Sequence, residues 1–238
     1  MKTIIAESGE KFLVKDLKND YHSKLGAVKK TDFKKNKAKT NTGVNVTIFD
    51  AFFLDKLEKM KREAQIIIPK DIGQILANTG IGKQSVVIDA GSGSGALACF
   101  IANIAKKVYT YDNNPAHVET VKENIKFFGL KNIEVNEHDV YTGFPAKDAD
   151  VLTLDLREPW LCIEHAYNAL KFGGFFVVYC PQITQAQQIV NENNNLKKFM
   201  HIKTIETSER QWKIEGYVVR PEFTALGHTG FLTIFRKV

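Results

Sequence analysis

The sequence predicts an α/β protein, with a doubly wound, mostly parallel sheet preceded by a small β-rich domain. From about residue 64 onward, continuous apolar segments alternate with helical segments, a pattern typical of a parallel sheet covered on both faces. One of these apolar segments runs directly into a glycine-rich turn and a helix. Before residue 64, short β-like segments alternate with turn residues instead, which indicates a separate module.

The first module contains three β-like segments, KFLVKDL, KLGAVKK and VNVTIFDAFF, which are punctuated by Gly9, Gly26 and Gly43. We therefore expect a β-rich domain over residues 1–63. The composition changes at the end of this range, so the second domain is expected over residues 64–238.

The second domain is expected to begin with a short helix at PKDIGQILANTG, because proline favours the first helical position and Gly80 can end the helix. The elements expected after it are strand SVVIDA, helix GALACFIANIAKK, strand VYTYD, helix NPAHVETVKENIKFFGL, strands NIEVNEHD and DVLTLD, helix PWLCIEHAYNALKFGG and strand FFVVYC. A helix rich in glutamine and asparagine and two further strands are expected to complete the domain.

The composition is that of an ordinary globular protein, with 238 residues of which 44% are hydrophobic and 25% charged. No apolar stretch approaches the roughly 20 residues that cross a membrane, and acids stand near the start where a signal peptide needs an apolar region. We therefore expect a cytoplasmic protein without a membrane span. Cys99, Cys162 and Cys180 are expected to be buried free thiols, since no cysteine or histidine spacing indicates a metal site.

The excess positive charge lies in the first quarter of the chain. Residues 1–63 hold 15 Lys and Arg against 9 Asp and Glu, whereas the remaining residues hold 18 of each kind. A basic module on an otherwise neutral protein favours a polyanionic partner such as a nucleic acid. A solvated lysine-rich surface explains the same counts equally well.

A glycine-rich loop, DAGSGSGAL, indicates a nucleotide-like cofactor. Gly91, Gly93 and Gly95 stand between a strand and a helix, where they allow a tight turn and close approach of the backbone to a ligand. Asp89 before the loop, together with Asp112 and Asp139 at the ends of the next two strands, favours S-adenosylmethionine over NAD. Any one of these acids could instead be a helix cap.

The segment VLTLDLREPW adds a fourth acid, Asp155, at the end of the strand expected beside the glycine-loop strand. This position is the one where a cofactor methyl group would meet its acceptor. The alternative interpretation is that Asp155 caps a helix beginning near Glu158 and that Trp160 belongs to the core.

The segment DLREPW resembles the D-x-P-x-P-W signature of the tRNA adenine-N1 methyltransferase family, whose target is adenosine 58 of the T loop. The other stretches that resemble this family are YHSKLGAVKK, QIIIPKDIGQIL, DAGSGSGAL, YDNNPAH, YCPQITQ and RPEFTALGHTGFLTIFRK, in which Arg220, Pro221 and His228-Thr229 match. The resemblance covers nearly the whole chain. It implies a seven-stranded Rossmann-like sheet of the class I S-adenosylmethionine-dependent methyltransferases, and a homotetramer.

The resemblance also implies roles for individual residues. The implied cofactor-binding residues are Asp89, Gly91, Gly93, Ser94, Gly95, Ala96, Leu97, Asp112, Asn113, His117 and Asp139. Asp155 is implied to be the catalytic acid, whose charge would stabilise an adenine that becomes cationic when its N1 lone pair takes the methyl group. The implied substrate-binding residues are Trp160, Tyr179, Gln185, Arg220 and His228, and no metal is implied.

The sequence departs from the family pattern at Ile68 and Arg157, and more mildly at Asp89 and Asp112, where glutamates are common. Ile68 stands where an aromatic residue is common, so Tyr179 or Trp160 would have to stack on the target base, and Arg157 replaces a common proline. Three alternatives stay open: a methyltransferase for a small molecule or for protein, similar to the isoaspartyl enzymes; a non-catalytic tRNA-binding subunit; and an NAD-dependent dehydrogenase. Whether position 57 is also methylated is open as well.

Overall fold

The computed structural model describes residues 1–238, and its chain forms two separately packed units, Met1–Met60 and Lys61–Val238. The sequence prediction set the boundary slightly later, after residue 63. No helix in the structure combines the length and the apolar character that crossing a bilayer requires.

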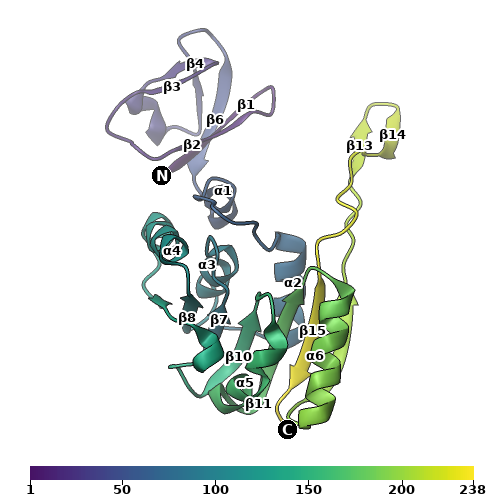
Figure 1. Ribbon diagram of the computed structural model, residues 1–238. Coiled ribbons are helices and arrows are strands. Elements are labelled where there is room, and N and C mark those ends of the chain that lie inside the picture. Colours follow the sequence, from purple (N-terminus) through teal and green to yellow (C-terminus); the bar gives the residue numbers. More distant parts are fainter. The chain divides into compact units, whose positions relative to one another are not determined.

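The first unit is a small β-rich module, as the sequence predicted (Figure 1). Its antiparallel sheet has the strand order β2-β1-β6-β5, and a separate hairpin pairs β3 with β4. The elements are β1 (Lys2–Ala6), β2 (Lys11–Val14), β3 (Tyr21–Ser23), β4 (Gly26–Val28), the 3-10 helix η1 (Lys30–Lys34), β5 (Lys37–Lys39), β6 (Asn45–Asp50) and α1 (Phe53–Leu57). Alternate residues of β1 and β6, among them Ile4 and Ile48, form its core together with Phe33.

The second unit is built on a seven-stranded sheet of order β12-β15-β11-β10-β7-β8-β9. Its five strands from β11 to β9 are mutually parallel, and β15 is antiparallel to both of its neighbours. The strands are β7 (Val86–Ala90), β8 (Lys107–Asp112), β9 (Ile133–Glu137), β10 (Ala149–Leu154), β11 (Leu170–Cys180), β12 (Met200–Glu206) and β15 (Phe231–Arg236). The predicted mostly parallel, seven-stranded sheet is thus confirmed.

Helices connect these strands, and their ends follow the local sequence. The helices are α2 (Pro69–Thr79), α3 (Ala96–Ala102), α4 (Pro115–Phe128), η2 (Val140–Thr142), η3 (Pro159–Cys162), α5 (Ile163–Ala169) and α6 (Ile183–Leu196). Both α2 and α4 begin with proline and end at a left-handed glycine, Gly80 and Gly129 respectively. Helices α5 and α6 pack on the sheet around a stack of Phe176 and Phe235, which are fully buried. The three cysteines are free and buried, as expected.

Three expected elements differ from the structure. The helix expected over GALACFIANIAKK already ends at Ala102. The helix expected from Pro159 to Gly174 ends at Ala169, because the next residues pair with β10 and extend β11, with a register shift in the pairing. The C-terminal part contains four strands rather than two, since β13 (Trp212–Glu215) and β14 (Val218–Pro221) form an additional hairpin.

This hairpin lies in a segment, residues 207–229, that we call the arm. It leaves the sheet after β12, projects away from it, and returns into β15 (Figure 1). Trp212 is 55% exposed on the arm.

Candidate active site

The strand register aligns four functional candidates along the carboxyl edge of the sheet. In the parallel pairs β8–β7, β7–β10 and β10–β11, the last paired residues lie directly side by side. The residues that follow them are Asp112, Gly91, Asp155 and Tyr179. Ligands bind at this edge in open parallel sheets, so the row marks the candidate site.

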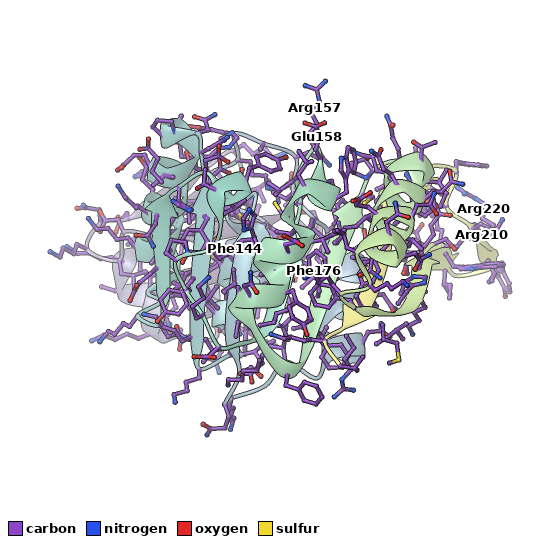
Figure 2. The ribbon with its side chains drawn as sticks, turned by 60° about the horizontal axis from the view of Figure 1, so that its bottom comes forward. Phe144, Arg157, Glu158, Phe176, Arg210 and Arg220 are labelled. Atoms are coloured by element: carbon purple, nitrogen blue, oxygen red, sulfur yellow. The ribbon has the colours of Figure 1, made fainter.

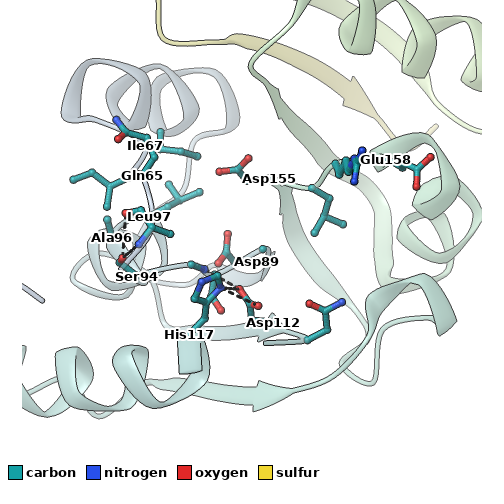
Figure 3. Close-up of a pocket in the computed structure, with 18 of the residues that line it drawn as sticks. Gln65, Ile67, Asp89, Ser94, Ala96, Leu97, Asp112, His117, Asp155 and Glu158 are labelled. Carbon is teal, nitrogen blue, oxygen red and sulfur yellow. Dashed lines mark hydrogen bonds and ion pairs between the residues drawn. The ribbon is translucent and has the colours of Figure 1, made fainter. Parts of the chain in front are cut away.

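A cavity of about 410 Å³ opens at this edge (Figure 3). The predicted residues that line it are Asp89, Gly91, Gly93, Ser94, Ala96, Leu97, Asp112, Asn113, His117 and Asp155. The lining residues that were not predicted are Ala64, Gln65, Ile66, Ile67, Ser92, Tyr141, Leu156, Arg157 and Glu158. Its volume lies within the usual range of small-molecule sites.

The glycine loop has the conformation that its sequence suggests. Gly91, Gly93 and Gly95 all have positive φ angles, +82°, +51° and +78°. A Cβ on Gly91 would lie 2.0 Å from the backbone oxygen of Asp155, so only glycine fits between the two strand ends. Gly95 does not line the cavity. A Cβ there would lie 3.1 Å from methyl groups of Val121, so this glycine lets α3 approach α4.

Asp112 is held in a fixed orientation at the mouth of the loop. Its Oδ2 accepts a hydrogen bond from the Gly93 N–H at 2.9 Å, and its Oδ1 accepts one from the Asn114 N–H at 3.0 Å. The Nδ1 atom of His117 lies 3.2 Å from both carboxylate oxygens. Asp112 and His117, which the resemblance implies to be cofactor-binding residues, therefore lie in contact with each other.

The hydrogen bonds of the Asp89 carboxylate are made to neighbouring strands of the sheet. Its carboxylate accepts hydrogen bonds from the hydroxyls of Thr110 on β8 and Thr153 on β10, at 2.6 and 2.7 Å. Burial raises the pKa of Asp89, while these two hydrogen bonds oppose the rise. Asp89 thereby ties together the three central strands whose ends form the site.

Asp155 points into the cavity (Figure 3). Burial, and secondarily the charge of Asp89, raise the pKa of Asp155 to about 7. The short helix η3 has Glu158 as its N-cap residue, so the alternative in which Asp155 caps this helix is wrong. A carboxylate of this kind, in a cavity and titrating near neutral pH, is typical of a functional group.

A segment that the sequence analysis missed closes one side of the cavity. Residues 61–67, which we call the strap, cross the glycine loop and contribute four lining residues. The Ser94 Oγ accepts hydrogen bonds from the N–H groups of Glu63 and Ala64, at 3.0 and 3.1 Å. The buried amide of Asn124 donates to the carbonyls of Lys61 and Ser94 and accepts from the Lys61 N–H. A lone asparagine on the apolar face of α4 was the available signal for this contact.

We expect Ser94→Ala to weaken cofactor binding about tenfold, because two strap N–H groups are left without their acceptor and the strap loosens. Isothermal titration calorimetry with S-adenosylhomocysteine measures the affinity of the variant and of the wild type. Thr79→Val is the matched control for stability, since it removes a buried hydroxyl that donates to the Ile75 carbonyl at 2.7 Å and does not line the cavity. An unchanged affinity in Ser94→Ala would contradict the role of the strap.

Four other predicted residues lie outside the cavity. Asp139 accepts a hydrogen bond from the Tyr141 N–H and lines a smaller adjoining recess together with Asp112 and Asn113. Trp160 is half-buried against the core. Tyr179 extends the row at the sheet edge, and burial raises its pKa to about 12. The Gln185 Nε2 donates to the Arg157 carbonyl at 3.0 Å, so this side chain braces the DLREPW loop.

The last two predicted residues belong to the arm. Arg220 lies on β14 (Figure 2) and does not line the cavity. Its guanidinium group stacks over the ring of Phe223, 3.9 Å from the ring centroid. His228 lies at the base of the arm, where Nδ1 contacts Glu206 at 2.6 Å and Nε2 contacts the Pro181 carbonyl at 2.7 Å. The Glu206 carboxylate and the Pro181 carbonyl both act as hydrogen-bond acceptors. These hydrogen bonds, first of all the one to Glu206, raise the pKa of His228.

The cavity fits a nucleoside cofactor that carries a positive charge. The glycine loop exposes backbone, Ser92 offers an unpaired hydroxyl, and Asp112 presents a fixed carboxylate of the kind that binds ribose. Asp155 adds a further carboxylate within the same cavity. The structure contains no cluster of three or more His, Cys, Asp or Glu that could hold a metal.

Comparisons with known proteins show the family of the chain. Residues 54–218 match the family described as the tRNA methyltransferase complex GCD14 subunit. The tRNA (adenine(57)-N(1)/adenine(58)-N(1))-methyltransferase TrmI of Methanocaldococcus jannaschii is 32% identical to the chain, over 99% of the chain and 94% of its own length.

Two crystal structures are similar over the whole chain. One is the tRNA (m1A58) methyltransferase TrmI of Aquifex aeolicus, with a TM-score of 0.83, 25% identity and 96% of that chain covered. The other is described as an S-adenosylmethionine-dependent O-methyltransferase of Thermotoga maritima, with a TM-score of 0.90, 29% identity and 92% coverage. The family match covers well over half of the chain, and the chain therefore belongs to the tRNA methyltransferase family of the GCD14 subunit and TrmI.

Proposed function

We propose that this chain transfers a methyl group from S-adenosylmethionine to N1 of adenosine 58 in the T loop of tRNA. The observation that carries the proposal is the Asp155 carboxylate, which lies in the glycine-loop cavity at the end of the strand beside that loop. The whole-chain similarity to tRNA adenine-N1 methyltransferases supports the same reaction. It also favours this reaction over an NAD-dependent or a non-catalytic role.

S-adenosylmethionine supplies an electrophilic methyl group on a cationic sulfur when it is bound. Asp112 and His117 would hold the ribose, with the Asp112 carboxylate kept in place by the N–H groups of Gly93 and Asn114. Asp155 would accept a hydrogen bond from the exocyclic amino group of adenine and stabilise the positive charge that develops on the base. N1 has its own lone pair, so the chain needs to orient the base rather than to activate it.

The direct test is reverse transcription of tRNA that has been incubated with the protein and S-adenosylmethionine. A methyl group on N1 blocks base pairing, so a stop opposite adenosine 58 is expected. Transcripts with a purine substitution at position 57 or 58 decide whether both positions are modified, as the name of the M. jannaschii relative states for that protein. Absence of any methyl-dependent stop would refute the proposal.

The Thermotoga maritima structure motivates a second candidate, methylation of an oxygen. An oxygen acceptor must lose a proton, and a carboxylate with a pKa near 7 such as Asp155 could take it. The same incubation separates the two, because a ribose 2′-O-methyl group resists alkaline cleavage but leaves the pairing edge of the base free.

We propose that the N-terminal module contributes tRNA-backbone contacts. Lys37 and Lys39 are exposed on the same side of β5, and Lys34 is exposed on η1. Replacing these three lysines with alanine is expected to raise the KM for tRNA about tenfold. The slope of log affinity against log salt should also become shallower by about 0.9 for each phosphate that the variant no longer neutralises. Steady-state kinetics at several salt concentrations measure both effects.

The matched control is the triple variant Lys83→Ala, Lys126→Ala and Lys131→Ala. These exposed lysines lie near the amino-terminal edge of the parallel strands, opposite the cavity. The same reduction of charge there should leave the KM for tRNA and its salt dependence unchanged. Equal effects of both triple variants would mean that the total charge, and not the module, controls binding.

We further propose that the chain forms a homotetramer and that the arm takes part in its assembly. The arm exposes large apolar side chains, which are Trp212, Ile214, Tyr217, Val218, Val219, Phe223 and Leu226. Ile214 and Val219 form a cross-strand pair of β13 and β14. Sedimentation velocity should show a tetramer for the wild type and a smaller species for Ile214→Ser/Val219→Ser, whereas a monomeric wild type would contradict the proposal.

A further inference from the structure

Tyr179 lies beside Asp155 at the carboxyl edge of the sheet. In the parallel pair β10–β11, Leu154 is paired with Val178, so the next residues along, Asp155 and Tyr179, are neighbours. Side chains at equivalent positions of adjacent parallel strands extend to the same side of the sheet. The carboxylates of Asp155 and Asp71 both add to the raised pKa of Tyr179, which agrees with a phenol lying close to both acids.

Thr229, the residue before Gly230, contacts both Asp71 and the hydroxyl of Tyr179. The Thr229 hydroxyl donates to Asp71 Oδ2 at 2.7 Å. Burial is the main cause of the raised pKa of Tyr179, and a hydrogen bond with the Thr229 side chain opposes this rise.

Gly230 holds the ring of the same tyrosine from the backbone side. A Cβ at Gly230 would lie 2.4 Å from Cζ and 2.7 Å from the hydroxyl oxygen of Tyr179. No side chain can be added there unless the ring moves. The adjacent residues Thr229 and Gly230 thus contact the polar tip and the rim of one ring.

Thr229 itself is held by a buried ion pair at the start of α2. The Nζ of Lys70 donates to Asp71 Oδ1 at 2.7 Å, to Thr229 Oγ1 at 2.7 Å and to the Thr207 carbonyl at 2.6 Å. The Lys70 and Asp71 side chains are only 7% and 2% exposed. The three N–H donors of the ammonium are all used, and they join both ends of the arm, Thr207 and Thr229, to α2.

We propose that Thr229 and Gly230, held by the Lys70–Asp71 pair, are positioning residues that fix Tyr179 beside Asp155 as a wall of the target-base pocket. The inference rests on the proposed function, because it assigns these residues to the acceptor half of that site. It also gives Ile68 a different place from the base, since this side chain lines a recess with Lys70, Gln211 and Leu226 of the arm. The stacking role would accordingly fall to Tyr179.

The test compares methyl transfer by Thr229→Val, Gly230→Ala, Tyr179→Phe and the double variant Thr229→Val/Tyr179→Phe. We expect Thr229→Val to lower kcat about tenfold and Gly230→Ala about 100-fold, because a displaced wall misorients the base. The affinity for S-adenosylhomocysteine should stay unchanged, since none of these residues lines the cofactor cavity. Thr229→Ser, which restores the hydroxyl, should recover most of the activity.

Thr233→Val is the matched control, as it removes a buried hydroxyl four residues along, which binds Thr204 instead. It should leave kcat unchanged. If Thr229 acts through the Tyr179 hydroxyl, the double variant should be no slower than the slower single variant. Independent, additive losses, or equal losses of cofactor affinity and activity, would overturn the proposal in favour of a purely structural network.

Crystal structures of the wild type and Thr229→Val with S-adenosylhomocysteine provide a readout that does not depend on the substrate. We expect the Tyr179 ring to change its side-chain torsion in the variant. An unmoved ring would overturn the positioning role even if the wild type methylates tRNA. A wild type that methylates no tRNA, combined with a displaced ring in the variant, would instead refute the proposed function. It would leave intact the contacts of Thr229 and Gly230 with Tyr179, which we call the tyrosine clamp.

Discussion

Asp155→Asn is expected to lower kcat for tRNA methylation by about 100- to 1,000-fold, the usual loss when one preorganised charge-stabilising group is removed. Asparagine keeps the size of the side chain but cannot offset a positive charge on adenine. Single-turnover methylation with a labelled methyl donor measures the chemical step directly. The affinity for S-adenosylhomocysteine should fall little, because the product has a neutral sulfur and the ribose contacts of Asp112 remain.

The control is Asp148→Asn, which makes the same change just before the other end of β10. Asp148 is exposed and has a left-handed backbone, with φ of 56°, which asparagine tolerates. Its activity should match the wild type. Full activity in Asp155→Asn would refute the catalytic role of Asp155.

The pH dependence gives a second check on Asp155. Its pKa of about 7 means that the carboxylate becomes ionised in the free protein as the pH rises through 7. The wild-type kcat/KM should therefore rise over pH 6 to 8, while Asp155→Asn shows no such rise. S-adenosylmethionine should also bind more tightly at pH 8 than at pH 6, and the neutral S-adenosylhomocysteine should show a smaller change.

The free energy of unfolding should fall as the pH rises, whereas the activity should rise. The pKa of Asp155 is above its ordinary value of 3.8, so the folded state binds more protons than the unfolded state between about pH 4 and pH 7. The stabilisation is complete at low pH and is lost as the pH rises through 7, at a cost of up to about 4 kcal/mol. Asp155→Asn should consequently have a higher melting temperature than the wild type at pH 8 and little advantage at pH 4.

The glycine-loop cavity could be predicted because it depends on local signals at known places in the fold. Asp112 and Gly91 follow adjacent parallel strands, and such strand ends converge on one edge whatever the details of packing. Predicting that Asp155 lies at the same edge required one further assumption, that its strand lies beside the glycine-loop strand. The register of β10 and β7 confirms this assumption.

The strap and the tyrosine clamp could not be predicted, because their contacts join residues far apart in the sequence. Ser94 and Glu63 lie 31 residues apart, and Lys70 and Thr229 lie 159 residues apart. The helix expected over LKFGG was wrong for a similar reason, since pairing with β10 outweighs the local pattern. Gln185 was assigned to the substrate, although its amide is engaged with the neighbouring loop.

Gly91→Ala should abolish detectable activity, with more than about a 100-fold loss of cofactor affinity, because the backbone that lines the cavity has to move. Two separate effects act at this position. The φ of +82° strains any side chain by about 1–2 kcal/mol. The added Cβ would also lie 2.0 Å from the Asp155 carbonyl oxygen, which can yield only by backbone displacement.

Gly80→Ala separates these two effects. Gly80 has a similar φ of +66°, but no atom lies within 4 Å of the position of its Cβ. It should lose stability of the order of 1 kcal/mol and keep its cofactor affinity and activity. A Gly91→Ala variant that behaves like Gly80→Ala would show that the strand ends at Gly91 and Asp155 can separate without harm. In that case the close approach of the glycine loop to the strand that carries Asp155 would not be needed for activity, because activity would survive their separation.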